Sequence, residues 1–240
     1  MDKITQLQNI IDHSSKIVFF TGAGVSCDSG IPDFRSQDGL YHQQYAYPPE
    51  TILSHRFFWQ NTAEFYRFYR NKMIYPQAKP NITHKFIAQL EKQGKCLGTI
   101  TQNIDGLHQM ANSRKVIELH GSIHRNYCTK CHKFYELSTI INSVSIPTCE
   151  CHGIIKPDVV LYEEALDEKN INDALSLILA CDTLIVCGTS LQVYPAASFV
   201  NYYQKDQLVL INKTCTPFDQ KADLVINQPL DQVLSQLVIR

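Results

Sequence analysis

Residues 16–41 read KIVFFTGAGVSCDSGIPDFRSQDGLY, and this stretch decides the fold class. An apolar run is followed by glycines at 22 and 24, which is how a dinucleotide-binding loop opens at the end of a strand. The pattern then departs from that fingerprint, because a third glycine should stand three residues after the second and Gly30 comes later. IPDFRS follows, with a proline, two charges and an aromatic side chain. The stretch therefore predicts a nucleotide site whose second half has a further task.

The composition is that of an ordinary globular protein. The chain has 240 residues, a net charge of −1, and 44% hydrophobic and 19% charged residues, which favours one large core with a smaller satellite. No basic excess indicates a nucleic-acid partner, and no apolar run approaches the roughly 20 residues of a membrane helix. The N-terminal residues lack a signal-peptide pattern and fit a helix instead. Five of the nine cysteines are scattered, as thiols of a reducing compartment are, so we expect a cytoplasmic protein.

Short apolar runs alternate with helical patterns along most of the chain. The expected strands are 16–20, 97–101, 115–119, 158–162, 182–187, 207–211 and 223–226. Helical periodicity lies between many of them, for example at 81–94 and 168–180. This alternation predicts an α/β fold with a Rossmann-like parallel sheet that is covered on both faces.

Two segments interrupt the alternation and predict a smaller lobe. Residues 33–80 are aromatic-rich and helical in pattern, and residues 124–154 carry paired cysteines. We therefore expect one catalytic domain, with a large lobe of 1–32, 81–123 and 155–240 and a small lobe of 33–80 and 124–154. A cleft between the lobes is the expected ligand site.

The paired cysteines predict one structural zinc ion. Cys128 and Cys131 form a C-x-x-C pair, and Cys149 and Cys151 follow after seventeen residues. Such pairs are typical of tetrahedral zinc, and four thiolates leave no open coordination position. The second pair is C-x-C, so His152, three residues after Cys149, is a competing ligand. Four free buried thiols are the alternative, which the polar flanking residues disfavour.

Small and polar residues follow the expected strands. TGAGVS follows 16–20, QNIDG follows 97–101, HGS follows 115–119, GTS follows 182–187 and NK follows 207–211. Ligands of open parallel sheets bind at the carboxyl ends of the strands. His120 is a candidate proton acceptor there, although an isolated histidine more often satisfies a buried carbonyl. Asn103 and Asp105 are either site residues or ordinary turn residues, and Asp33 with Arg35 is either part of the site or a surface ion pair.

In this order, the motifs resemble those of the sirtuins, which are NAD-dependent protein lysine deacylases. The resemblance rests on TGAGVSCDSGIPDFRS, TQNIDGLH, ELHGS, CGTSLQVYPAA and the four-cysteine module, and it covers nearly the whole chain. It implies a bacterial single-domain protein deacetylase that binds NAD and one zinc ion. Such an enzyme breaks the bond between nicotinamide and ribose and transfers the acetyl group of an acyl-lysine protein or peptide to ADP-ribose.

The resemblance also implies roles for the matched residues. His120 would be the general base, Asn103 would order the ribose and nearby water, and Asp105 with the Ile104 backbone would hold the nicotinamide carboxamide. Phe34 would shield the reacting ribose. The other implied cofactor contacts are Gly22, Ala23, Gly24, Cys27, Asp33, Arg35, Gln102, Gly188, Thr189, Ser190, Asn212 and Asp231. The implied zinc ligands are Cys128, Cys131, Cys149 and Cys151. The implied substrate contacts are Tyr66, Val159, Val160, Leu161 and Tyr162, the last four beside a peptide paired as a strand.

Four features depart from the sirtuin pattern. Cys27 replaces a common threonine, which is tolerable where the backbone binds the phosphates. Cys149 stands one residue late, and we expect a tighter loop to bring it to the zinc ion. Glu163 replaces a glycine, the residue that permits an unusual φ, and its carboxylate would disfavour acidic neighbours in a peptide. Tyr69 stands where succinyl- and malonyl-removing members have arginine, and Arg70 lies about 100° further round the helix. An acetyl or a longer apolar acyl group is therefore favoured.

Two other functions stay open on the sequence alone. One is an NAD glycohydrolase or ADP-ribosyltransferase that uses the same site, and the other is a zinc-ribbon binding module that catalyses nothing. Release of O-acetyl-ADP-ribose distinguishes the deacetylase from the first, and NAD binding distinguishes it from the second. A monomer is slightly favoured over an oligomer.

Overall fold

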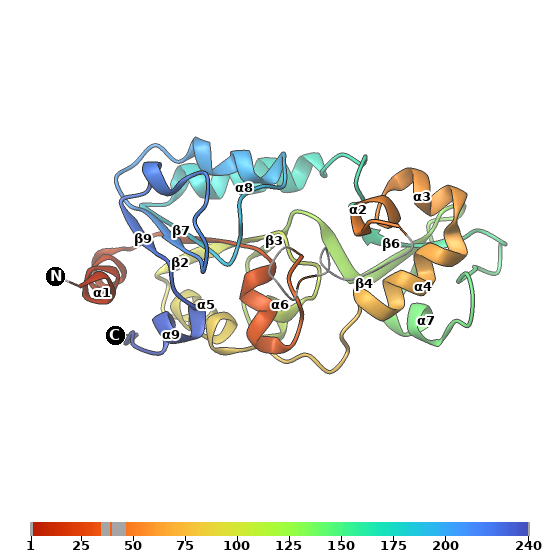
Figure 1. Ribbon diagram of the computed structural model, residues 1–240, viewed down its shortest axis with the longest axis horizontal. Helices are drawn as coiled ribbons and strands as arrows, with labels where there is room; N and C mark the ends of the chain where they lie inside the picture. The colour runs from red at the N-terminus through yellow and green to blue at the C-terminus, as the bar shows by residue number, and fades with distance from the viewer. Residues whose placement is uncertain (1, 35–38, 40–46, 240) are drawn as a thin grey trace.

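The computed structural model describes residues 2–34, 39 and 47–239. Its larger part is built on a six-stranded parallel sheet in the order β3-β2-β1-β7-β8-β9 (Figure 1). The strands are β1 (Ile17–Thr21), β2 (Cys96–Thr101), β3 (Val116–Glu118), β7 (Thr183–Cys187), β8 (Leu208–Ile211) and β9 (Leu224–Ile226). β1 lies between β2 and β7, so the glycine loop that follows it opens in the middle of the sheet's carboxyl edge. The predicted Rossmann-like α/β sheet is confirmed.

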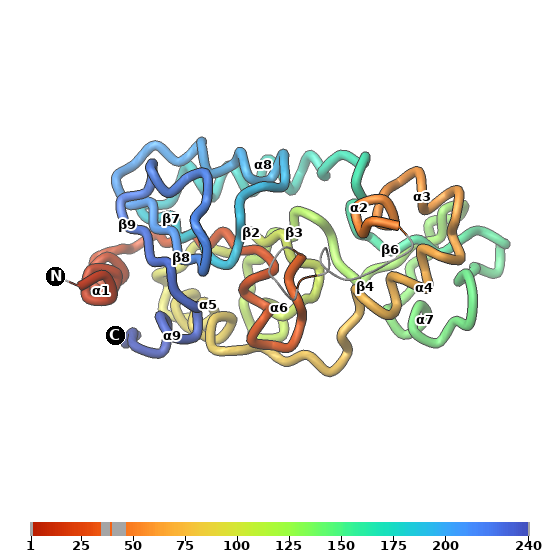
Figure 2. The backbone as a smooth tube through the Cα atoms, in the orientation of Figure 1, coloured from red at the N-terminus to blue at the C-terminus, as the bar shows by residue number. Residues whose placement is uncertain are grey.

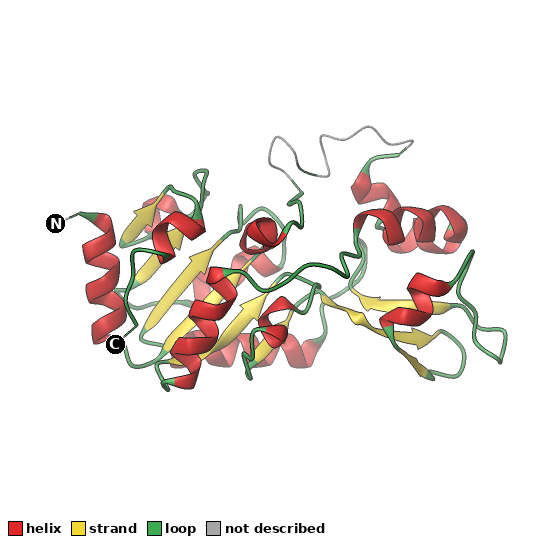
Figure 3. Cartoon of the chain, turned by 90° about the horizontal axis from the view of Figure 1, so that it is seen from below, coloured by secondary structure: helices red, strands yellow, loops and turns green. Residues whose placement is uncertain are grey.

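Helices cover both faces of this sheet (Figures 1 and 3). One core contains α1 (Lys3–His13), α5 (Ile82–Lys92) and α9 (Leu230–Leu234), and the other contains α8 (Glu168–Ala180) and the 3₁₀ helix η3 (Ala196–Tyr202). Successive residues of β1 enter opposite cores, with Ile17 and Phe19 in the first and Val18 and Phe20 in the second. Burial on both faces explains why the strands read as continuous apolar runs. No helix in the described ranges is long and apolar enough to cross a bilayer.

The two ends of the described chain meet at one end of the larger part (Figure 2). The Gln8 side chain of α1 accepts a hydrogen bond from the Val238 N–H at 2.8 Å and donates one to the Val238 carbonyl at 2.9 Å. Two short elements follow strands at the carboxyl edge, η1 (Ala23–Ser29) after β1 and α6 (Leu107–Met110) after β2, whereas η4 (Asp219–Lys221) precedes β9 at the amino edge.

The smaller part packs helices on a three-stranded antiparallel sheet. The strands are β4 (Gly121–Cys128), β5 (Phe134–Tyr135) and β6 (Ile155–Val159), in the order β5-β4-β6, and the helices are α2 (Pro49–Ile52), α3 (His55–Gln60), α4 (Thr62–Lys72) and α7 (Leu137–Asn142). Aromatic side chains dominate its core, where Phe58 packs edge-on against Phe65 and Phe65 stacks on Tyr69. The aromatic-rich segment is therefore mainly core, although 47% of Trp59 is exposed.

The strand expected at 158–162 is wrong in position and partner. β6 ends at Val159 and pairs antiparallel with β4, outside the parallel sheet. The apolar run continues because the chain here passes between two cores: Val159 and Leu161 face the core of the smaller part, and Val160 packs against the larger one. β4 also crosses the expected boundary at 123/124, and the division into lobes stays a prediction.

Candidate functional site

The glycines of the first loop bring two strand ends into direct contact. Gly24 N–H donates to the Gly188 carbonyl at 2.8 Å, which joins the loop after β1 to the loop after β7. A Cβ on Gly24 would lie 2.8 Å from the Gly188 backbone, and a Cβ on Gly188 would lie 2.4 Å from the Val25 nitrogen. Real Cβ atoms do not approach so closely, so both positions require glycine. The late Gly30 is also explained, because it ends η1 with a left-handed φ of 84°.

Asn103 and Asp105 are held in place through Ser26. The Asn103 amide donates to the Gly22 carbonyl at 3.0 Å and to Ser26 Oγ at 3.1 Å, and it is 8% exposed. Ser26 Oγ in turn donates to Asp105 Oδ2 at 2.6 Å. Burial raises the pKa of Asp105, while the Ser26 hydrogen bond opposes that rise. Sequence reasoning missed Ser26, and the only sequence signal for it is its place in the TGAGVS loop.

His120 lies next to this group as a neutral base. Its Nδ1 lies 2.9 Å from the Gln102 carbonyl, so Nδ1–H donates to that oxygen and Nε2 carries the lone pair in the neutral tautomer. Burial lowers the pKa of His120, and the bond to Gln102 partly opposes this. The Gln102 side chain donates to Thr189 Oγ1 at 3.0 Å. The ends of β2, β3 and β7 thus meet at one site.

Cys27 and Asp33 lie together on the outer side of the first loop. Cys27 Sγ lies 3.7 Å from Asp33 Oδ2. Burial, followed by the charge of Asp33, raises the pKa of Cys27 to about 11, so the thiol stays protonated and poorly nucleophilic. Ala23 begins η1 beside this pair.

The other predicted cofactor residues are spread along the carboxyl edge or at the junction of the two parts. Ser190 follows β7 and Asn212 follows β8, and Asp231, in the first turn of α9, interacts electrostatically with Asp28 of η1. Phe34 and Ile104 both pack against the core of the smaller part. Arg35 lies outside the described residues.

Tyr66 does not lie at an open surface. It is 0% exposed within the core of the smaller part, and its hydroxyl donates to the Ile155 carbonyl. Burial raises the pKa of this hydroxyl far above its usual value. In this structure the side chain stabilises the packing of α4 on β6 and offers no group to a peptide.

The predicted peptide edge is already partly hydrogen-bonded. Val160 N–H donates to the His120 carbonyl at 3.0 Å, Tyr162 N–H donates to the Leu53 carbonyl at 2.9 Å, and Leu161 N–H donates to Glu164 Oε2 at 2.9 Å. The Tyr162 carbonyl accepts from His55 N–H at 2.9 Å. A peptide strand at this edge therefore has to use backbone groups other than these.

Glu163 adopts the backbone conformation that favours glycine, with a φ of 75°. Its Oε2 accepts the Arg56 N–H at 3.0 Å, which fastens the loop after β6 to the first turn of α3. Together with residues that include Glu50 and Tyr162, it lines a hollow of about 390 Å³ beside the predicted peptide edge.

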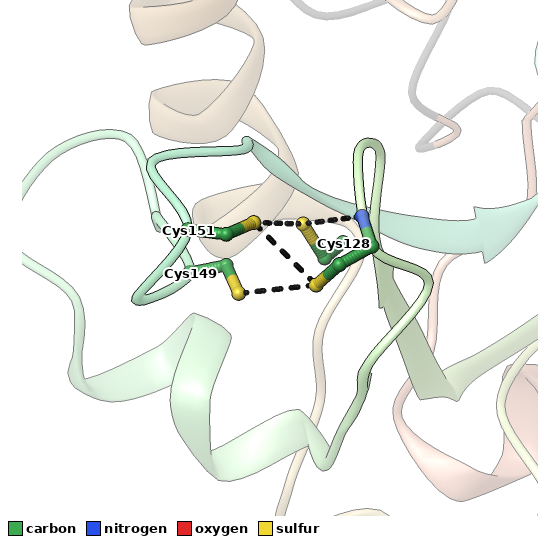
Figure 4. A group of neighbouring side chains, drawn as sticks. Cys128, Cys149 and Cys151 are labelled. Atoms are coloured by element: carbon green, nitrogen blue, oxygen red, sulfur yellow. Dashed lines mark hydrogen bonds between the residues drawn. The ribbon is translucent and has the colours of Figure 1, made fainter.

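Four cysteines form a compact cluster in the smaller part, and Figure 4 labels three of them, Cys128, Cys149 and Cys151. Cys128 Sγ lies 3.3 Å from Cys151 Sγ, and Cys131 Sγ lies 3.5 Å from Cys149 Sγ. All four sulfurs lie within 4.8 Å of one another. A zinc ion bonded to four sulfurs at about 2.3 Å holds them about 3.8 Å apart, so the cluster fits one tetrahedral ion. Cys149 reaches the cluster as predicted, and among the described side chains His152 is not part of it.

A tight turn makes the unusual C-x-C pair possible. His152 N–H donates to the Cys149 carbonyl at 2.9 Å, and Cys149 N–H donates to the Gly153 carbonyl at 2.8 Å. A Cβ on Gly153 would lie 2.5 Å from Cys128 Sγ. The turn therefore needs glycine beside the sulfur cluster.

Comparisons with known proteins agree with this geometry. The family model described as "Sir2 family" matches residues 22–195, which include the glycine loop, His120 and the four cysteines. The chain belongs to the Sir2 family. Among curated Sir2-family relatives, the NAD-dependent protein deacetylase of Clostridium acetobutylicum is 53% identical and that of Clostridium tetani is 54% identical. The alignments cover 99% of this chain and 99% and 98% of those proteins.

Solved Sir2 structures share the fold. Sir2 with deacetylated p53 peptide and 3′-O-acetyl ADP-ribose matches with a TM-score of 0.90 and 37% identity, over 98% of this chain and 96% of the other. Sir2 with p53 peptide and NAD⁺ matches with a TM-score of 0.85 and 38% identity, over 98% and 97% of the two chains.

Proposed function

We propose that this protein is an NAD-dependent protein lysine deacetylase that releases nicotinamide and transfers the acetyl group to ADP-ribose. The observation that carries the proposal is the neutral His120. Its Nδ1 is committed to the Gln102 carbonyl, so its Nε2 is the proton acceptor in a site otherwise built of nucleotide-binding loops. The named relatives and the Sir2 complexes with peptide and acetyl-ADP-ribose support the same activity.

The residues present fit NAD, which supplies the ribose carbon that takes the acyl oxygen as nicotinamide leaves. The loops after β1 and β7 would hold the pyrophosphate with backbone groups, as such loops do elsewhere. Asn103 and Asp105, fixed by Ser26, would orient the ribose and the carboxamide. His120 Nε2 would accept a proton from a ribose hydroxyl, which requires the neutral form of the ring.

The proposed cofactor contacts are those of the strand ends and their neighbours. They are Gly22, Ala23, Gly24, Cys27, Asp33, Phe34, Arg35, Gln102, Asn103, Ile104, Asp105, His120, Gly188, Thr189, Ser190, Asn212 and Asp231. The four cysteines hold one zinc ion, and because they fill its coordination shell, its role is structural.

Acetyl-lysine peptides are the proposed substrates. Arg70 of α4 is not available to an acidic acyl group, because its guanidinium donates to the Ile140 carbonyl at 2.8 Å and to Ser143 Oγ at 2.5 Å. These bonds turn Arg70 toward α7. We further propose a cytoplasmic location, in keeping with the free thiols at Cys96, Cys181 and Cys187, all of which are buried.

The test is incubation of the protein, and of a His120→Ala variant, with NAD and an acetyl-lysine peptide, followed by mass spectrometry. We expect deacetylated peptide, nicotinamide and O-acetyl-ADP-ribose from the wild type, and neither of the two acetyl-transfer products from the variant. Free ADP-ribose without any peptide turnover would refute the proposal in favour of glycohydrolysis.

A further inference from the structure

His120 stands where the chain leaves one sheet and enters the other. Only Leu119 and His120 separate β3 of the parallel sheet from β4 of the smaller sheet. Figure 1 shows β4 leading from the larger part into the smaller one. On one side, Leu119 N–H donates to the Thr101 carbonyl at 2.9 Å. On the other side, the His120 carbonyl accepts from Val160 N–H at 3.0 Å. The position of the imidazole therefore depends on how the two sheets are held together.

Arg125 spans this junction. Its Nη1 donates to Glu118 Oε2 at 2.6 Å, and its Nε donates to Asp158 Oδ2 at 2.7 Å. Glu118 is the last residue of β3, and Asp158 belongs to β6. One guanidinium thus joins the parallel sheet to the smaller sheet on both sides of His120.

An irregularity in β4 aims Arg125 at the junction. Ser122 pairs with Asp158 and Asn126 pairs with Pro157, so residues 123–125 bulge from the ladder between β4 and β6. Bulges re-aim side chains and recur beside active sites. In a regular ladder the Arg125 backbone would pair with β6. In the bulge it has no ladder partner, and its side chain reaches both Glu118 and Asp158.

The contact differs from an ordinary surface ion pair in that one of its carboxylates is nearly buried. The Glu118 side chain is 8% exposed, while those of Arg125 and Asp158 are 38% and 42% exposed. Guanidinium groups suit such paired carboxylates because several N–H donors lie in one plane. Without the cation, Glu118 is a nearly buried charge with no counter-ion, and it faces a second carboxylate across the junction.

We propose that Arg125 is a positioning residue that holds the two sheets together around His120 and so sets where the base stands. The proposal rests on the deacetylase function above. Loss of nicotinamide needs no base, whereas movement of the ribose proton needs His120. Loss of Arg125 therefore slows formation of O-acetyl-ADP-ribose and leaves the earlier, reversible exchange of nicotinamide in place.

The experiment compares Arg125→Met and Arg125→Lys with wild type and with His120→Ala. A matched control is Arg67→Met on α4, because the Arg67 guanidinium, like that of Arg125, donates two hydrogen bonds to carboxylate oxygens. Both oxygens belong to Glu64, at 2.8 and 2.6 Å, and this pair lies on the surface. Each protein is first checked by thermal unfolding. Exchange of labelled nicotinamide into NAD and formation of O-acetyl-ADP-ribose are then measured in the presence of acetyl-lysine peptide.

Arg125→Met is expected to lower the kcat for O-acetyl-ADP-ribose on the order of 10- to 100-fold, the cost of a base displaced by up to about 1 Å. Its exchange rate should match that of the wild type, and His120→Ala should form no O-acetyl-ADP-ribose. Arg125→Lys should recover part of the loss, since an ammonium group replaces the charge but not the fork. Arg67→Met should change neither rate.

The inference is overturned if Arg125→Met lowers both rates by the same factor or changes neither. If Arg125→Met fails to fold, the ratio of the two rates in Arg125→Lys decides, and a ratio equal to that of the wild type overturns it. A wild type that shows neither exchange nor acetyl transfer would instead refute the proposed function.

Discussion

Between pH 6.5 and about pH 5 the free energy of unfolding is expected to fall less in a variant with His84→Asn and His108→Gln than in the wild type. The two rings lie beneath the nucleotide site with their centroids 4.8 Å apart, and they are 0% and 1% exposed. His84 Nδ1 meets the side chain of Asn81, and His108 Nε2 meets Thr21 Oγ1. Asn and Gln present a polar atom near those two ring positions.

The size of the effect follows from the pKa values. Burial lowers the pKa of His84 from 6.5 to about 4 and that of His108 from 6.5 to about 3. The folded state therefore holds both rings neutral, while the unfolded chain takes up protons below pH 6.5. The contribution of the two neutral rings to the free energy of unfolding is fully present above pH 6.5. It is lost as the pH falls toward the pKa values of the rings in the folded state. At about pH 5 each ring costs about 2 kcal/mol, so the pair costs about 4 kcal/mol.

The assay is urea unfolding of wild type and the double variant at several pH values from 7.5 to 5. The double variant should lose about 4 kcal/mol less than the wild type between the two ends of this range. His13→Gln is the matched control, because His13 is exposed on α1, and it should follow the wild type. Equal losses in the wild type and the double variant would refute the view that these rings are kept neutral by burial.

Three further changes probe the junction, the zinc cluster and the base. Gly121→Ala should lower the free energy of unfolding by at least about 2 kcal/mol, measured by urea titration, because φ is 75° and a Cβ would lie 1.9 Å from the Asp158 carbonyl oxygen. Cys149→Ser should lower both bound zinc, measured by elemental analysis, and Tm, since the metal stabilises the fold; an unchanged zinc content would contradict the assigned ligand set. The kcat/KM of wild type should hold down to about pH 6.5 and fall tenfold per pH unit only below the lowered pKa of His120, whereas a fall beginning above pH 7 would contradict a neutral base.

The sequence predicts the parallel sheet well because its strands are buried on both faces. Residues such as Ile17 and Val18 are both fully buried, each in a different core, and this leaves a run that no surface strand shows. The same criterion fails at Val159–Leu161, where an equally apolar run bridges two cores without being a strand of the sheet. An apolar pattern predicts that a segment is buried, but it does not predict in which of the cores the segment lies.

The site is predictable as a set of motifs but not as an arrangement. Gly22 and Asn103 are recognisable as nucleotide-site residues. That Asn103 donates to the Gly22 carbonyl, and that Ser26 joins Asn103 to Asp105, depends on contacts across about 80 residues of sequence. A matched motif position also does not show whether its side chain is accessible. Tyr66 is buried in the core of the smaller part, where its hydroxyl donates to the Ile155 carbonyl.

Glu163 shows how a local rule can be broken without loss of the fold. A non-glycine residue at a φ of 75° costs on the order of 1 kcal/mol. The carboxylate offsets that cost by accepting the Arg56 N–H at the first turn of α3. A side-chain hydrogen bond to a free N–H of a first helical turn contributes about 1 kcal/mol. Glycine would remove the strain and the contact together. Glu163 in place of glycine therefore ties the loop after β6 to α3, beside the predicted peptide edge.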